Sequence, residues 1–249
     1  MFVPAKCLLM FGMISAAYAA DVVLRVAGQE GVPPKFIYES GTVTGICPDI
    51  LRAIEQSDAG VRFVGDDKPL SVPLIEQQLE NGTADIACAL IDTPRRRSVA
   101  NRVEFPLYSV HERVAVRIDD NVEVNDLAGL VRAGGIIVTF SGAAYAPMLR
   151  RLGATVDDSN ADAISGMRRV QSGHARFLYM SDLAMERALH ESHMEGQIKI
   201  LPVVLNTEPL YMWVSAKLPG DVLHRIEHAV AQLSTSGTLS RIYDKYEAH

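Results

Sequence analysis

The chain has 249 residues and a formal net charge of −6, with 30 acidic against 24 basic side chains. This mildly acidic balance argues against nucleic acid as a partner. Hydrophobic residues make up 48% of the chain, which is enough for the core of one large domain or two small ones.

The first 20 residues predict a secretory signal peptide. Lys6 is followed by an apolar run over residues 7–17 and then by Ala17-Tyr18-Ala19, which has the A-x-A form of a cleavage site. The run is too short for a permanent membrane span, and a buried N-terminal helix is the alternative. We therefore expect a soluble, exported protein.

Beyond residue 20, apolar strands alternate with amphipathic helices, which is typical of an α/β protein with parallel sheets. The first part of the chain predicts strands at 22–27, 61–64 and 84–90, and helices at 45–56 and 72–80.

A strand at 113–118 ends in Asp119-Asp120-Asn121, a polar break that indicates a crossover into a second lobe. The sequence of that lobe predicts strands at 136–140 and 177–180. It also predicts one helix that ends at Leu152 and two helices at 160–171 and 182–191. The expected division is 1–20 signal peptide, 21–112 and 213–249 lobe 1, and 113–212 lobe 2 including the hinge strands.

Two cysteines follow the signal peptide, namely Cys47 at the start of a predicted helix and Cys88 on a predicted strand. An exported protein occupies a compartment that permits disulfides. A Cys47–Cys88 bridge is one interpretation and a pair of free buried thiols is the other, because the sequence does not show their geometry.

Residues 82–97 place a buried strand, a turn and an arginine cluster in succession. Thr93 is a predicted N-cap, and Pro94 takes the first helical position. The cluster Arg95–Arg97 then occupies a helix turn that normally favours acidic side chains. Three cations there indicate that an anion binds nearby, and the arginine fork suits a carboxylate. A solvated basic face with local salt bridges is the alternative.

The order Gly-x-x-Asp, apolar strand, Thr-Pro-x-Arg and then Phe-Pro-Leu-Tyr resembles the signature of periplasmic solute-binding proteins of ABC importers. The resemblance is to the polar amino acid type, bacterial extracellular solute-binding protein family 3. Gly45, Asp49 and Ile50 also match part of that family's Gly-Phe-Asp-x-Asp-Leu pattern. The ending AVAQLSTSGTLSRIYDKY resembles its last helices, so the resemblance covers nearly the whole mature chain.

The resemblance implies a type II periplasmic binding protein fold, in which each lobe is a mostly parallel sheet flanked by helices and two crossover strands form the hinge. It implies a monomer in the periplasm that captures a small carboxylate-bearing ligand, such as an amino acid, between its lobes. An ABC permease in the inner membrane would then recognise the closed form. No cofactor, metal or covalent chemistry is expected.

The resemblance assigns the carboxylate clamp to Arg96, but other positions depart from the family pattern. Residues 142–144 read Gly-Ala-Ala where the family has Gly-Thr-Thr, and Ser141 is the substitute hydroxyl. Ile91 stands where the family has a hydroxyl residue. The family's acid aligns with Ser181 or Asp182, for which a helix cap is the alternative. These departures leave α-amino acid specificity open. The predicted ligand set is Arg96, Ile91, Thr93, Ser141, Tyr145, Asp182 and Phe36.

Aromatic candidates for a ligand contact are Phe36, Tyr145 and Tyr179, with Tyr145 preferred and ordinary packing as the alternative. Trp213 is expected to pack near the hinge.

A different class of function is an enzyme on the same fold, similar to a dehydratase that acts on a small carboxylic acid. Its general acid would come from Glu39, His111, Glu112 or His174, for which surface exposure is the alternative. A metal site is one interpretation of His190, Glu191 and His193, and a solvated helix face is the simpler one. A sensory or accessory ligand-binding protein is a third alternative.

Overall fold

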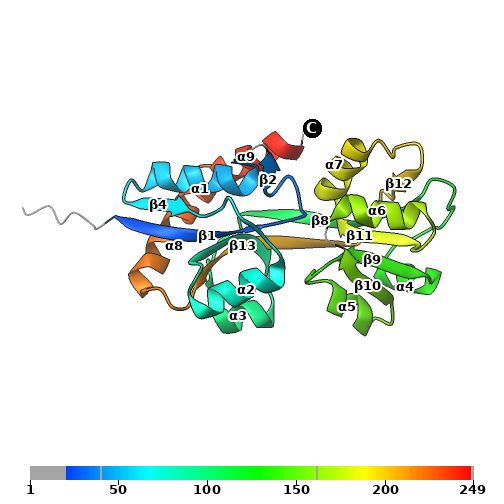
Figure 1. The fold of residues 1–249 in the computed structure, drawn as a ribbon, viewed down its shortest axis with the longest axis horizontal. Helices are drawn as coiled ribbons and strands as arrows, with labels where there is room; N and C mark the ends of the chain where they lie inside the picture. The colour runs from blue at the N-terminus through cyan, green and yellow to red at the C-terminus, as the bar shows by residue number, and fades with distance from the viewer. Residues whose placement is uncertain (1–20, 40, 161, 248–249) are drawn as a thin grey trace, which may run out of the picture.

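The computed structural model describes residues 21–39, 41–160 and 162–247, so the predicted signal peptide lies outside the described residues. These residues form two lobes side by side along the long axis of the molecule, joined by two long strands (Figure 1). Among them, no helix is long and apolar enough to cross a membrane.

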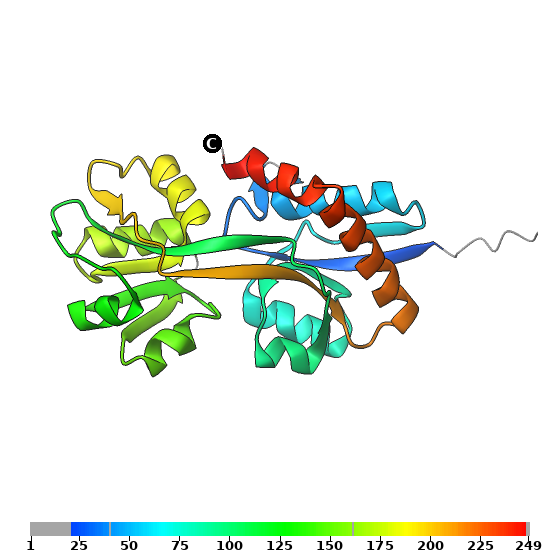
Figure 2. The ribbon, with the colours of Figure 1, turned by 180° about the vertical axis from the view of Figure 1, so that it is seen from behind.

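The first lobe combines the N-terminal part of the chain with its two C-terminal helices, which follow one another along that lobe (Figure 2). Its strands β6, β1 and β4 lie side by side in parallel, with β4 at the end of the sheet. The elements are β1 (Val22–Gln29), β2 (Ile37–Glu39), β3 (Thr42–Thr44), α1 (Ile46–Ser57), β4 (Val61–Val64), β5 (Pro69–Leu70), α2 (Val72–Asn81), β6 (Ile86–Ile91), α3 (Pro94–Val99), β7 (Ala100–Arg102), α8 (Gly220–Thr235) and α9 (Thr238–Glu247).

The second lobe is built around the parallel strands β10, β9 and β11. Its elements are α4 (Leu127–Ala133), β9 (Ile136–Phe140), α5 (Ala146–Arg151), β10 (Thr155–Asn160), α6 (Ala163–Gln171), β11 (Phe177–Ser181), α7 (Asp182–Ser192) and β12 (Ile198–Ile200). The predicted helix at 160–171 therefore begins too early. Residues 155–160 pair with β9 instead, and the Asp162 side chain caps α6 by accepting from the Ser165 N–H at 2.7 Å.

Two antiparallel strands, β8 (Tyr108–Arg117) and β13 (Asn206–Ser215), run from one lobe into the other (Figures 1 and 2). They lie between β11 and β6, so a single sheet passes through both lobes. The predicted lobe boundaries fall within or beside these strands and stay a prediction. The main sheet of the described residues thus has a mostly parallel part in each lobe, and the two antiparallel hinge strands connect these parts.

Each lobe has its own hydrophobic core. In the first lobe, α1, α8 and α9 pack against one face of the sheet, and α2 and Trp213 pack on the other. The second core gathers β9, β11, α6 and α7. Leu183 of α7 is an exception, because it packs into the core of the first lobe. The lobes are therefore in apolar contact in this structure.

Cys47 and Cys88 form a disulfide, so the bridged interpretation holds in the structure. Their Cα atoms are 5.9 Å apart. Both side chains are fully buried in the first-lobe core, where the bridge joins α1 to β6. The same part of α1 holds the preceding loop, because the Cys47 N–H donates to the carbonyl of Lys35 at 3.1 Å.

Candidate functional site

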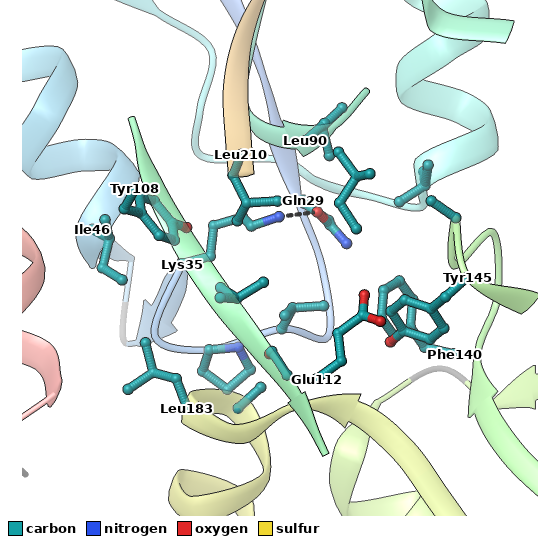
Figure 3. A pocket seen from close by; sticks show the side chains of 18 of the residues that line it. Gln29, Lys35, Ile46, Leu90, Tyr108, Glu112, Phe140, Tyr145, Leu183 and Leu210 are labelled. Atoms are coloured by element: carbon teal, nitrogen blue, oxygen red, sulfur yellow. Dashed lines mark hydrogen bonds between the residues drawn. The ribbon is translucent and has the colours of Figure 1, made fainter. Parts of the chain in front are cut away.

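A cavity lies where the two lobes and the hinge strands meet (Figure 3). The space between its atoms amounts to about 650 Å³ with the opening to solvent included, but only about 60 Å³ of it admits the centre of a water molecule, so the cavity is narrow in this conformation. Most of the lining is apolar, and its ionisable groups are Lys35, Arg96, Glu112, Tyr108 and Tyr145. An adjoining hollow shares residues with it and extends past Thr93. The cavity therefore suits a small, partly apolar ligand with a few charged contacts.

Arg96 is fixed by the local structure that the sequence predicts. The Thr93 hydroxyl caps α3 by accepting from the Arg96 N–H at 3.2 Å. The guanidinium lies on the cavity wall and only 3% of Arg96 is exposed. Its Nε is 3.0 Å from Glu76 Oε1, and Nη1 donates to the carbonyl of Ile91 at 2.5 Å.

One edge of this guanidinium stays available. Among the described residues, Nη2 of Arg96 has no hydrogen-bond partner, since the guanidinium contacts Glu76 and Ile91 through Nε and Nη1. Burial lowers the pKa of Arg96 from its ordinary value, while Glu76 acts in the opposite direction. Because Glu76 faces Nε and the carbonyl of Ile91 accepts one hydrogen of Nη1, the N–H groups of Nη2 remain for an anionic partner.

Arg95 and Arg97 have a different role from Arg96. Both are exposed. Arg95 pairs with Glu80 at 2.5 Å, and Arg97 pairs with Asp92 at 2.6 Å. The alternative interpretation, a solvated face with local salt bridges, therefore describes these two residues, and only Arg96 of the cluster lies on the wall of the central cavity.

Lys35 is a second buried cation on the cavity wall, and the sequence did not single it out. Its Nζ donates to Gln29 Oε1 at 2.7 Å (Figure 3). Burial lowers the pKa of Lys35 to about 7, and repulsion from Arg96 acts in the same direction. Lysine is usually exposed, so the segment Val32-Pro33-Pro34-Lys35 carries no signal of this role.

Glu112 is a buried carboxylate on hinge strand β8, with 1% of its surface exposed. Its Oε2 accepts from Tyr179 Oη at 2.6 Å and from Asn206 Nδ2 at 3.3 Å. Its Oε1 is buried without a hydrogen-bond partner among the described residues. Burial raises the pKa of Glu112 to about 7, against the lowering effect of those two hydrogen bonds. Surface exposure, the alternative to a general-acid role, is therefore wrong for Glu112.

The structure brings only some of the predicted ligand residues to the cavity. Arg96, Ile91 and Tyr145 lie on its wall, and Thr93 lies in the adjoining hollow. The contact predictions themselves remain untested, because they concern a bound ligand.

Three other predicted contacts lie elsewhere among the described residues. Phe36 is buried in the first-lobe core, where it stacks on Tyr38. Ser141 is exposed to solvent, while its neighbour Gly142 lines the cavity. Asp182 Oδ2 lies 3.7 Å from Arg113 Nε, and Ser181 is the residue on the cavity wall. Of the two adjacent residues at the end of β11, Ser181 thus lines the cavity and Asp182 does not.

The remaining candidates have ordinary structural surroundings. Tyr179 is in the second-lobe core and Trp213 packs beside the hinge, where its Nε1 donates to the carbonyl of Leu90 at 3.1 Å. Glu39 and His174 are exposed, and His111 contacts Thr207 on the hinge surface. The His190 side chain is 86% exposed beside Glu195.

Three solved structures show the same fold. A histidine kinase sensor domain with similarity to periplasmic binding proteins has a TM-score of 0.78 at 15% identity, covering 90% of this chain and 95% of that one. A putative ABC transporter binding component from Wolinella succinogenes, complexed with lysine, has a TM-score of 0.74 at 24% identity, covering 90% and 94%. An ancestral amino acid-binding protein, a precursor of cyclohexadienyl dehydratase, has a TM-score of 0.73 at 18% identity, covering 90% and 95%.

These likenesses confirm the predicted two-lobed α/β fold of periplasmic binding proteins. A comparison with curated protein sequences found no significant match. The family model of bacterial extracellular solute-binding proteins, family 3, matches residues 24–249. The chain therefore belongs to the bacterial extracellular solute-binding proteins of family 3.

Proposed function

We propose that this protein captures a small carboxylate-bearing ligand between its lobes and delivers it to an ABC permease in the inner membrane. It would act in the periplasm as a monomer after removal of residues 1–20. The observation that carries this proposal is the buried guanidinium of Arg96, a residue of the cavity wall whose Nη2 has no hydrogen-bond partner among the described residues.

The charges around Arg96 favour an anionic group. Arg96 and Lys35 line the same cavity, and each is almost fully buried. Their mutual repulsion contributes to the lowered pKa of Lys35, and Glu76 faces Arg96 only on the Nε side. Because a buried cation is unfavourable without a counter-ion, a ligand carboxylate near both groups would offset this repulsion.

Contacts between the lobes support binding by closure. The turn at Gly142 in the second lobe lies against Val72 and Pro73 at the start of α2 in the first, and Leu183 packs into the first-lobe core. A ligand that contacts Arg96 and the second lobe together would favour this arrangement over an open one. The permease would then recognise the closed form.

An enzyme similar to a dehydratase is the second candidate. Glu112 favours it, since a carboxyl with a pKa of about 7 retains its proton near neutrality, as a general acid must. A receptor partner in place of a permease is a variant of the binding function, in line with the sensor domain of similar fold.

Isothermal titration of the purified protein with amino acids and short carboxylates tests the proposal. Arg96→Ala should weaken binding of the best carboxylate by about 2–5 kcal/mol, or at least about thirtyfold in Kd. Arg96→Lys should also bind weakly, because lysine keeps the charge but lacks the fork. The control Arg97→Ala removes an exposed arginine of the same cluster and should bind normally.

Circular dichroism of each variant verifies that the fold is intact. Equal affinities of Arg96→Ala and the wild-type protein would rule out the clamp. Recovery of the carboxylate unchanged after incubation supports transport, and its conversion to product supports the enzyme.

A further inference from the structure

Glu112 occupies a position that carboxylate capture alone does not explain. It is the only carboxylate among the described residues that line the central cavity. It lies on the hinge strand β8 rather than on either lobe's helix termini. Figure 3 shows its side chain extending from that strand towards Tyr145 and Phe140.

The two oxygens of Glu112 are used unequally. Oε2 receives hydrogen bonds from Tyr179 of β11 and Asn206 of β13, which fix the carboxylate in place. Oε1 has no donor among the described residues, although it is buried. A buried, unpaired carboxylate oxygen is strongly unfavourable, so a donor on the ligand would complete its coordination.

The surrounding groups favour a positively charged donor. Glu208 on the neighbouring hinge strand adds negative potential at Glu112. Phe140 and Tyr145 line the cavity beside it, and their rings pack edge to face with centroids 5.8 Å apart. Aromatic ring faces attract cations. A carboxylate next to such rings is a suitable environment for an ammonium group.

The second lobe supplies no other acid at this place among the described residues that line the cavity. Asp182, the nearest candidate in the sequence, lies by Arg113 at 3.7 Å. Its Oδ1 also accepts from the N–H of Leu183 at 2.8 Å. The acid on the cavity wall thus belongs to the hinge and not to the second lobe.

We propose that Glu112 determines specificity by accepting, through Oε1, a hydrogen bond from a protonated amine of the ligand, with Phe140 and Tyr145 against the same group. The proposal rests on the proposed function, since it describes the other end of the same cavity. The ligand is then a compound with a carboxylate near Arg96 and an ammonium group at the hinge. The ammonium bears N–H groups, because a fully methylated nitrogen offers Oε1 no donor.

Titrations with four compounds of the same carbon chain separate the two ends of the cavity. Hexanoate has only the carboxylate, hexylamine has only the ammonium, and norleucine and 6-aminohexanoate have both at different separations. The proteins are the wild type, Glu112→Gln and the control Glu123→Gln, which removes an exposed carboxylate that lines neither the cavity nor the adjoining hollow. A pH of about 8 keeps the amines protonated and Glu112 ionised.

The wild-type protein should bind one of the two amino carboxylates at least tenfold more tightly than hexanoate. Glu112→Gln should lose about ten- to a hundredfold of affinity for that compound, because hydrogen bonds to charged groups carry an effect of this size, and should bind hexanoate as before. Glu123→Gln should behave as the wild type does. Glutamine preserves the shape of the side chain, and circular dichroism verifies the fold.

Three results would overturn the proposal. One is undiminished amino carboxylate binding by Glu112→Gln, which would mean that the charge of Glu112 has no part in binding. The second is equal wild-type affinity for hexanoate and both amino carboxylates. The third is no binding of any amine. If hexylamine binds in a Glu112-dependent manner but hexanoate does not, Glu112 keeps its role and the carboxylate part of the proposed function fails.

Discussion

Replacement of Gly142 by alanine should weaken ligand binding by blocking closure of the lobes. Gly142 has a φ of +76°, and a Cβ atom there would lie 2.8 Å from Pro73 Cδ and 3.0 Å from Val72 Cβ. Neither neighbour is the far end of a flexible side chain, so the turn and α2 would have to separate. The clash exists only where the second lobe meets the first, so an opened molecule avoids it.

The expected effect has two parts. Alanine at a positive φ costs about 1–2 kcal/mol in any conformation of the lobes. Overpacking against Val72 and Pro73 adds about 1–3 kcal/mol to the closed state alone. Ligand affinity, which depends on closure, should therefore fall by about 5- to 150-fold.

Gly173→Ala is the matched control, because Gly173 has a φ of +79° and lies in the same lobe. A Cβ there would be 3.5 Å from the end of the Arg117 side chain, which is an ordinary contact. This variant should lose stability but keep the wild-type affinity.

Isothermal titration measures the affinities with the ligand found in the carboxylate series, and small-angle scattering measures the radius of gyration. Gly142→Ala should be more extended than Gly173→Ala in the presence of that ligand. Equal affinity and equal size of the two variants would refute the argument that the Gly142 contact belongs to the ligand-bound state.

Two further predictions concern the stability of the fold. Replacing both Cys47 and Cys88 by alanine releases a constraint over a sequence separation of 41 residues and should lower the unfolding free energy by about 4 kcal/mol. Guanidinium titration measures the loss of unfolding free energy. After reduction of its disulfide, the wild-type protein should be as stable as the variant. A difference under about 1 kcal/mol before reduction would contradict the loop-closure argument. Burial raises the pKa of Glu112 to about 7 against an ordinary 4.5, so the folded protein keeps a proton that the unfolded chain loses between these values. The wild-type unfolding free energy should thus fall by about 3 kcal/mol relative to Glu112→Gln as the pH rises through that window. Parallel urea titrations of both proteins measure this difference. The same pH dependence in both proteins would contradict the raised pKa of Glu112.

The fold could be predicted because its signals are local. The strand at 61–64 and the strand at 136–140 have the bounds that the sequence predicts. Thr93 and Pro94 define the start of α3 through the cap and the missing N–H. The strand at 155–160 was missed because its residues Thr-Val-Asp-Asp-Ser-Asn are polar. Only pairing with β9, a non-local contact, makes it a strand.

The site was less predictable, since it depends on which residues tertiary contacts bury. Arg96 follows a motif with fixed spacing, so its place on the cavity wall could be anticipated. Lys35 and Glu112 carry no such motif, and both residue types are normally exposed. Phe36 shows the converse, because the sequence of a large aromatic residue does not distinguish a cavity wall from the core in which Phe36 is buried. Burial of a polar residue is set by the sheet and hinge together, which single-residue patterns do not encode.

The distribution of charge in the cavity suggests how recognition and closure are divided among its parts. Arg96 and Lys35 belong to the first lobe, and Glu112 belongs to the hinge. The second lobe lines the cavity mainly with Phe140, Tyr145 and small or apolar residues. Its approach therefore removes few polar groups from water, and the closing step gains apolar burial without a large desolvation penalty. If the proposed function holds, charged groups on the first lobe and hinge select the ligand before the second lobe encloses it. The ionic ends of the ligand would then determine specificity, and its apolar body would determine closure.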